Sequence, residues 1–169
     1  MFIKVEDIDL HAAIPRQVHL ALTNDPRVMT VMWATRTSNT LSMVEVWPFS
    51  RPRHKKLFRG SISTLEGSPT VMHTVKITGL HPGHKYGYRV GDPMIDSWCR
   101  DYWFETQGRH ATQTRFVAVG DLDLQEDGTR KNLEFLKEHI LEFDILILLG
   151  DLHYKWGDIL DEMGEALEP

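Results

Sequence analysis

Two aliphatic runs, each closed by a glycine and an aspartate, place the strongest constraint on the fold of this 169-residue chain. Residues 117–121 read VAVGD, and residues 145–151 read ILILLGD. Short apolar runs without polar interruptions are typical of parallel strands that are buried on both faces of a sheet. The sequence therefore predicts two such strands, each leaving the sheet at a Gly-Asp pair.

The segment between the two runs has the pattern of a helix. Residues 128–141 read GTRKNLEFLKEHIL, and they place Leu133, Leu136, Lys137 and Ile140 near one face at helical spacing. A strand, a helix and a second strand in about 35 residues form a βαβ unit with parallel strands.

The first half of the chain has the pattern of short β-strands instead. Runs such as VHLALT, VMTVMWAT and KYGYRV alternate with turn sequences such as TNDPR and HPGH. About seven short strands separated by turns indicate an antiparallel β-sandwich. Leu80, Pro82, Gly83 and Tyr86 form L-x-P-G-x-x-Y, which resembles the corner of fibronectin type III domains where a tyrosine bonds to nearby backbone.

These patterns predict a β + α/β chain: a fibronectin type III-like sandwich followed by the first βαβ unit of a second domain. We expect an N-terminal extension over residues 1–13, the sandwich over 14–107, a linker over 108–114, and a partial α/β domain over 115–169.

The paired Gly-Asp sequences predict a metal site. Ligands bind beyond the carboxyl ends of parallel strands, and neighbouring strands lie about 4.8 Å apart, so Asp121 and Asp151 can converge. Two converging carboxylates repel each other unless a cation lies between them. A single Gly-Asp pair is more often a turn or a helix cap, but two pairs in one βαβ unit favour a metal.

The same residues resemble a known family. VAVGDLD and ILILLGDLHY are similar to the first two motif blocks of the calcineurin-like metallophosphoesterases, above all the purple acid phosphatase branch, where they read G-D-x-G and G-D-x-x-Y after a fibronectin-like sandwich. The tail WGDILDEMGEALEP also resembles the segment that follows the second block. The resemblance covers about residues 14 to 169.

The resemblance implies an acid phosphatase that hydrolyses phosphomonoesters at a dinuclear metal centre. By its motifs, Asp121 would ligate Fe(III), Asp151 would bridge both metals, and Tyr154 would ligate Fe(III) through its phenolate. The second metal would be Fe(II), Zn(II) or Mn(II).

The sequence departs from this family pattern in two residues. Asp123 stands where the family usually has glycine, and His153 occupies a position that is often small. Both are possible accessory residues, and we favour a solvent-facing role for each over a metal ligand.

The remaining family blocks, G-N-H-[ED], V-x-x-H and G-H-x-H, do not occur in these residues. The metal centre would therefore lack most of its ligands, and no complete catalytic set is present. We expect the chain to be an N-terminal portion of a purple acid phosphatase-like protein, with little or no phosphatase activity by itself.

Two other functions remain open. In the first, the sandwich is a non-enzymatic binding module joined to a degenerate phosphatase remnant. In the second, Asp121 and Asp123 form the D-x-D of a haloacid dehalogenase-type phosphatase, although that interpretation leaves the second Gly-Asp pair unexplained.

Composition limits the partners. With 41% apolar and 25% charged residues and a net charge of −5, the chain has a globular composition that argues against non-specific nucleic-acid binding. No stretch approaches the roughly 18 apolar residues of a membrane span, and no secretory signal is visible, although family members are mostly secreted, vacuolar or lysosomal. We expect a phosphomonoester substrate and no nucleic-acid or membrane partner, and leave a homo-oligomer and the compartment open. The single Cys99 is expected to be a partly buried thiol.

Overall fold

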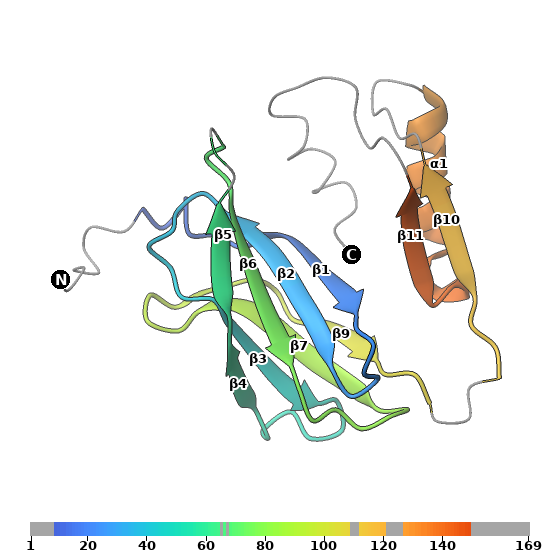
Figure 1. The fold of residues 1–169 in the computed structure, drawn as a ribbon, viewed down its shortest axis with the longest axis horizontal. Helices are drawn as coiled ribbons and strands as arrows, with labels where there is room; N and C mark the ends of the chain where they lie inside the picture. Colours follow the sequence, from blue (N-terminus) through green and yellow to red (C-terminus); the bar gives the residue numbers. More distant parts are fainter. Residues whose placement is uncertain (1–8, 65, 67, 109–111, 121–126, 150–169) are drawn as a thin grey trace. The chain divides into compact units, whose positions relative to one another are not determined.

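A computed structural model describes residues 9–64, 66, 68–108, 112–120 and 127–149 (Figure 1). The chain divides into two compact units, one that reaches Arg109 and one that starts at His110. None of the described helices is long and apolar enough to cross a membrane.

The first unit contains two antiparallel sheets. One sheet has the order β1-β2-β6-β5, and its strands are β1 (Arg16–Leu22), β2 (Met29–Thr35), β5 (Ser61–Thr64) and β6 (Val71–Ile77). The other has the order β4-β3-β7, with two further strands along the free edge of β7; its strands are β3 (Met43–Pro48), β4 (Lys56–Arg59), β7 (Lys85–Asp92), β8 (Ser97–Trp98) and β9 (Tyr102–Glu105). The first order corresponds to the A-B-E-D sheet of immunoglobulin-like sandwiches.

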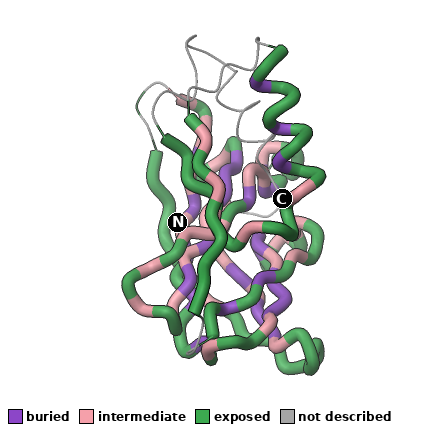
Figure 2. The backbone as a smooth tube through the Cα atoms, turned by 90° about the vertical axis from the view of Figure 1, so that its right-hand side faces the viewer, coloured by how far each residue is buried: buried purple, intermediate pink, exposed green. Residues whose placement is uncertain are grey.

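The core lies between these two sheets. Alternate residues of the strands point inward, and the largest fully buried side chains include Trp33, Tyr88 and Ile77. Figure 2 shows these buried positions as purple segments along the strands. The predicted antiparallel sandwich followed by a short α/β piece is confirmed.

The expected number of strands was too low. The sequence pattern missed β4 and β5, which have four residues each. Strands this short carry little periodicity, and β5, which is exposed throughout, has one apolar residue among its four.

β4 and β5 belong to different sheets, and Gly60 is the single residue between them. A Cβ atom at Gly60 would overlap the carbonyl group of Thr74 on β6. The Gly60 N–H donates to the Ser42 carbonyl oxygen at 2.9 Å. Glycine is required here because the chain passes close to another strand where it changes sheet.

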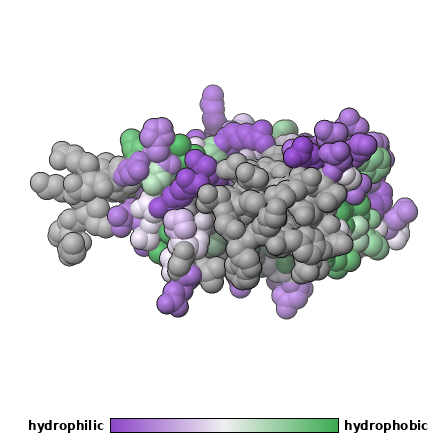
Figure 3. Space-filling view, turned by 90° about the horizontal axis from the view of Figure 1, so that it is seen from above, coloured by the Kyte–Doolittle hydropathy of each residue, from purple (hydrophilic) through white to green (hydrophobic). Residues whose placement is uncertain are grey.

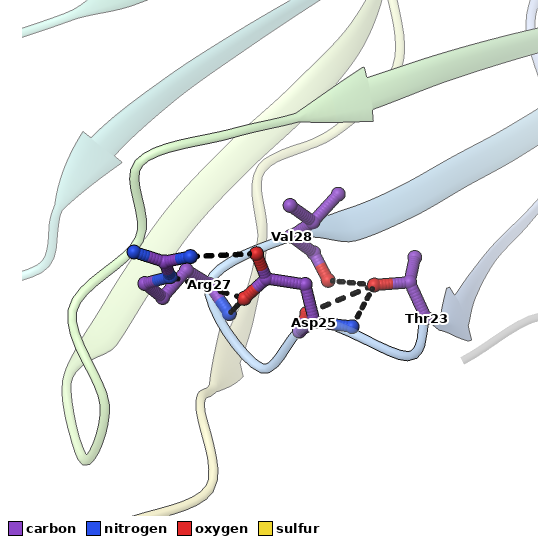
Figure 4. Close-up of polar contacts among 4 residues, drawn as sticks. All are labelled: Thr23, Asp25, Arg27 and Val28. Atoms are coloured by element: carbon purple, nitrogen blue, oxygen red, sulfur yellow. Dashed lines mark hydrogen bonds and ion pairs between the residues drawn. The ribbon is translucent and has the colours of Figure 1, made fainter.

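The predicted turn between β1 and β2 is held by its own side chains (Figure 4). The Thr23 hydroxyl donates to the carbonyl oxygens of Asp25 and Val28 at 2.8 and 3.1 Å. The Asp25 carboxylate accepts from the backbone N–H and from the guanidinium of Arg27. These hydrogen bonds to the Arg27 side chain and backbone lower the pKa of Asp25. The turn sequence thus closes the hairpin through local contacts.

The tyrosine corner predicted from L-x-P-G-x-x-Y is present. The backbone N–H of His81 donates to the Tyr86 hydroxyl at 2.9 Å, and Tyr86 is only 7% exposed. Gly83 has a φ of +70°, a conformation that favours glycine. The motif therefore fixes the connection between β6 and β7.

The second unit consists of β10 (Phe116–Gly120), α1 (Asp127–Glu138), a 3₁₀ turn η2 (Ile140–Glu142) and β11 (Ile145–Leu149). β10 and β11 pair in parallel, as the sequence predicted. The predicted helical face is only partly correct. Leu133 and Leu136 are buried, but Lys137 is exposed and Ile140 lies in the 3₁₀ turn, 47% exposed. The helix ends at Glu138, and the tighter turn that follows changes the direction of its side chains.

The described two-strand part of the sheet does not bury its strands on both faces. In β11, the side chains of Leu146, Ile147 and Leu148 are 36–37% exposed and that of Leu149 is 54% exposed. The described part of this sheet has two strands, and two strands with one helix cannot cover both faces. Figure 3 shows hydrophobic residues, in green, beside hydrophilic ones, in purple, on the surface of the chain.

Candidate metal centre

The candidate site lies at the carboxyl ends of β10 and β11. The two strands pair from Phe116 opposite Ile145 to Gly120 opposite Leu149, without a break in register. Because the strands are parallel, Gly120 and Leu149 lie at the same edge of the sheet.

Gly120 allows a close approach of the two strands at this edge. A Cβ atom at position 120 would lie 2.5 Å from the Leu149 carbonyl oxygen and 3.4 Å from the Leu149 Cβ. Real Cβ atoms do not come this close to an oxygen, so any larger residue would push the strand ends apart. Glycine is therefore needed immediately before the first candidate ligand.

The opposite ends of the same strands are joined by Arg115 and Asp144. The Arg115 N–H donates to Asp144 Oδ2 at 2.8 Å, and the Asp144 N–H donates to the Arg115 carbonyl oxygen at the same distance. The guanidinium adds a 3.2 Å contact with Oδ1. The backbone hydrogen bond from Arg115, followed by its side-chain bond, holds the pKa of Asp144 below its usual range. This pair fixes the register of the parallel strands at their start, and sequence reasoning missed it.

The five residues predicted for the site, Asp121, Asp123, Asp151, His153 and Tyr154, lie outside the described residues. Their predicted metal-binding and accessory roles stay predictions. The structure brings together the two strand ends that precede them.

Within the described ranges, no group of three or more His, Cys, Asp or Glu side chains could hold a metal ion. His139, just beyond α1, donates from Nδ1 to the Phe135 carbonyl oxygen at 2.8 Å and stacks on the Phe135 ring. Its contacts are local to the helix end.

One buried polar cluster in the sandwich was missed by sequence reasoning. The His73 ring is fully buried between Thr35 and Ser42, with both hydroxyl oxygens 2.8 Å from its nitrogens. The Thr35 hydroxyl donates to the Thr37 carbonyl oxygen, so it accepts from His73 Nε2–H, and Ser42 donates to Nδ1. The ring also stacks on Trp33 at 4.9 Å. The alternation of the strand was the signal that could have found it, because it puts His73 on the same face as Val75 and Ile77.

The environment of His73 keeps it uncharged. Burial, opposed by the nearby charge of Asp92, lowers the pKa of His73 from 6.5 to about 4. An uncharged, fully paired imidazole in the core of a sandwich stabilises the fold, and it is remote in sequence from the candidate metal ligands.

Comparison with known proteins identifies the family. Residues 15–106 match the model of the purple acid phosphatase N-terminal domain. The chain therefore belongs to the purple acid phosphatase family, a family of phosphatases and so of hydrolases.

Individual relatives extend the similarity beyond the sandwich. The chain is 31% identical over 158 residues to purple acid phosphatase 21 of Arabidopsis thaliana, an alignment that covers 91% of this chain and 34% of that protein. It is 28% identical over 166 residues to purple acid phosphatase 23 of the same plant, covering 83% of this chain and 35% of the relative. The chain thus spans about a third of the length of these relatives.

A solved structure has the same fold. The purple acid phosphatase PPD1 from yellow lupin seeds superposes with a TM-score of 0.76 and 19% identity, over 92% of this chain and 34% of that one. This likeness supports the arrangement of a sandwich followed by an α/β piece.

Proposed function

We propose that this chain belongs to a metal-dependent phosphomonoester hydrolase, to which it contributes the sandwich and the first two metal-binding blocks. The observation that carries the proposal is the parallel pairing of β10 and β11 up to Gly120 and Leu149. Both Gly-Asp sequences continue directly from that one sheet edge.

Chain geometry supports the convergence of the two aspartates. In the sequence, Asp121 is the residue after Gly120, and Asp151 is the second residue after Leu149. Paired strands lie about 4.8 Å apart, and each residue advances the chain by at most about 3.8 Å. This short tether supports the proposal that the two carboxylates share one cation.

The donor types match the metals that the family resemblance implies. Two carboxylates and a phenolate are oxygen ligands, which suit a hard trivalent ion such as Fe(III) and a borderline divalent partner. Asp121 and Tyr154 would hold Fe(III), and Asp151 would lie between Fe(III) and Fe(II), Zn(II) or Mn(II). When bound, the pair of metals would supply a nucleophile and neutralise the charge of a phosphomonoester.

Residues 1–169 supply only part of such a centre. The histidine- and asparagine-containing blocks of the family do not occur in this sequence. The whole activity therefore needs ligands beyond these three, and we expect the chain by itself to have little or no turnover.

The first test is spectroscopic. Fe(III) is titrated into the 169-residue chain, and a tyrosinate-to-iron absorption band is sought in the visible range. We expect a band in the natural chain, its loss in Tyr154→Phe, and weaker iron binding in Asp151→Asn. Asp123→Asn is the matched control, because it removes one carboxylate from the same segment and should keep the band. A band that is unchanged in Tyr154→Phe would contradict the assignment.

The second test is catalytic. The purified chain, supplied with Fe and Zn, is assayed with p-nitrophenyl phosphate, and no turnover is expected. Turnover would refute the expectation that the metal centre of this chain lacks ligands needed for activity. A covalent phosphate that disappears in Asp123→Asn would instead favour a haloacid dehalogenase-type reaction.

A further inference from the structure

A recess at one end of the sandwich combines an apolar floor with a basic mouth. It has a volume of about 120 Å³ and lies between the β3–β4 hairpin and the corner that joins β6 to β7. Val46, Ile77 and Leu80 form its floor, and each is at most 4% exposed. His54 and Lys56 line it from the hairpin.

His81 adds a third basic side chain from the opposite wall. The basic residues come from segments about 25 residues apart in the chain, so the fold and not local sequence gathers them. None of the residues that line the recess is an aspartate or a glutamate. Its electrostatic preference is therefore for an anion.

The pairing of β3 with β4 explains why Lys56 belongs to the recess and Lys55 does not. Lys56 is the Cα partner of Val46, and opposite residues of a strand pair share one face of the sheet. Lys56 thus lies on the same side as the buried Val46. Lys55 instead donates to Glu45 at 2.8 Å and lies over the Trp47 ring.

The Lys56 charge at the mouth is not already neutralised. Across the described part of the chain, neither the Lys56 ammonium nor the His54 ring makes a hydrogen bond or an ion pair with another side chain. The His81 ring lies beside the ring of His84, with 5.6 Å between the ring centroids. An anion that binds at the mouth would therefore not have to displace an existing hydrogen-bond or ion-pair partner of these side chains.

The wall that carries His81 is rigid. The His81 N–H donates to the Tyr86 hydroxyl, and the His81 carbonyl oxygen accepts from the Thr106 hydroxyl at 2.6 Å. Gly79 and Gly83, on either side, have φ values of +72° and +70° that fix the turn. A preformed wall reduces the entropy lost on binding.

Size restricts the ligand to a small molecule. A buried apolar cavity of about 150 Å³ accepts benzene. The recess is somewhat smaller but open to solvent, so its volume limits the enclosed part of a ligand to at most one ring or a short branched chain.

We propose that this recess is a binding site for a small amphiphilic organic anion, with its apolar body on the floor and its carboxylate or phosphate group at Lys56, His54 and His81. The site lies wholly in the sandwich and does not depend on the proposed phosphatase function.

The test is a titration of the isotope-labelled 169-residue chain followed by backbone amide NMR. The probes are benzoate, phenyl phosphate, the neutral benzyl alcohol, and inorganic phosphate. We expect saturable shifts around the recess for at least one of the two aromatic anions, with a dissociation constant in the millimolar range or below. The comparison of benzoate with phenyl phosphate shows which anionic group is preferred.

Variants of the basic residues test how much the charge at the mouth contributes to anion binding. Lys56→Gln and His81→Gln should each weaken anion binding about fivefold or more while the amide spectrum stays folded. Lys76→Gln is the matched control, because Lys76 is an exposed lysine beside Ile77 that points away from the core. It should leave the affinity unchanged.

Several results would overturn the proposal. Absence of saturable shifts at the recess would do so, as would binding of benzyl alcohol as tight as that of benzoate and phenyl phosphate. Equal binding of inorganic phosphate would mean a surface anion effect without the apolar floor. Equal loss of affinity in Lys76→Gln would have the same meaning.

Discussion

The buried His73 predicts that the sandwich loses stability in acid. Its ring has no access to solvent, and its two nitrogens are already paired with Thr35 and Ser42. Protonation places a charge in the core, which burial disfavours, and only Asp92 partly offsets it.

The direction and size of this change in the free energy of unfolding follow from the pKa of His73. The pKa of His73 is lowered from 6.5 to about 4, so between these values the unfolded chain binds more protons than the folded one. The stabilisation is fully present above about pH 6.5 and is lost as the pH falls toward 4. Each pKa unit corresponds to about 1.4 kcal/mol, so the loss by pH 4 is about 3 kcal/mol.

The assay compares the natural chain with His73→Gln. Glutamine can still donate to Thr35 or accept from Ser42, but it does not titrate. Urea unfolding followed by tryptophan fluorescence gives the free energy of unfolding at about pH 7.5 and about pH 4. We expect the variant to be less stable at the higher pH and to lose about 3 kcal/mol less than the natural chain on acidification.

Carboxylates contribute to acid sensitivity in both proteins, so the difference between them isolates His73. An identical loss of stability in both would refute the reasoning. So would an NMR titration in which the His73 ring has an ordinary pKa in the folded chain.

Two further predictions concern the corner and the strand ends. Tyr86→Phe removes the partner of the His81 N–H and should destabilise the sandwich by about 1–2 kcal/mol, measured by urea unfolding; no change would mean that water replaces the hydroxyl. Gly120→Ala should separate the ends of β10 and β11, seen as faster amide hydrogen exchange in both strands, because its Cβ would lie 2.5 Å from the Leu149 carbonyl oxygen. Gly128→Ala in α1 is its control, since a Cβ there meets nothing within 4 Å and should leave exchange in the strands unchanged; equal exchange in the two variants would contradict the close approach at Gly120.

Local sequence determined several features of this protein. Alternation of apolar residues set the longer strands of the sandwich, and L-x-P-G-x-x-Y set the corner with its Tyr86 hydrogen bond. The aliphatic runs before Gly120 and Gly150 predicted the parallel pair, because only the residues of each run are needed to specify such strands.

The candidate site is only partly accessible to the same reasoning. The two Gly-Asp sequences can be read directly, and their resemblance to a family names Asp121, Asp151 and Tyr154 as ligands. The close contact between Gly120 and Leu149, and the Arg115–Asp144 pair that sets the register, depend on residues about 30 positions apart. No local pattern links such positions.

Only the tertiary structure decided the rest. His73 is one of nine histidines, and the alternation of β6 puts it on the inward face, but its partners Thr35 and Ser42 come from segments more than 30 residues away. The sequence RPRHKK has the composition of a solvated loop, yet pairing with β3 turns Lys56 toward the apolar recess and leaves Lys55 on Glu45. Sequence specifies which groups are present and the local period of the chain, whereas burial and charge environment arise from contacts between distant segments.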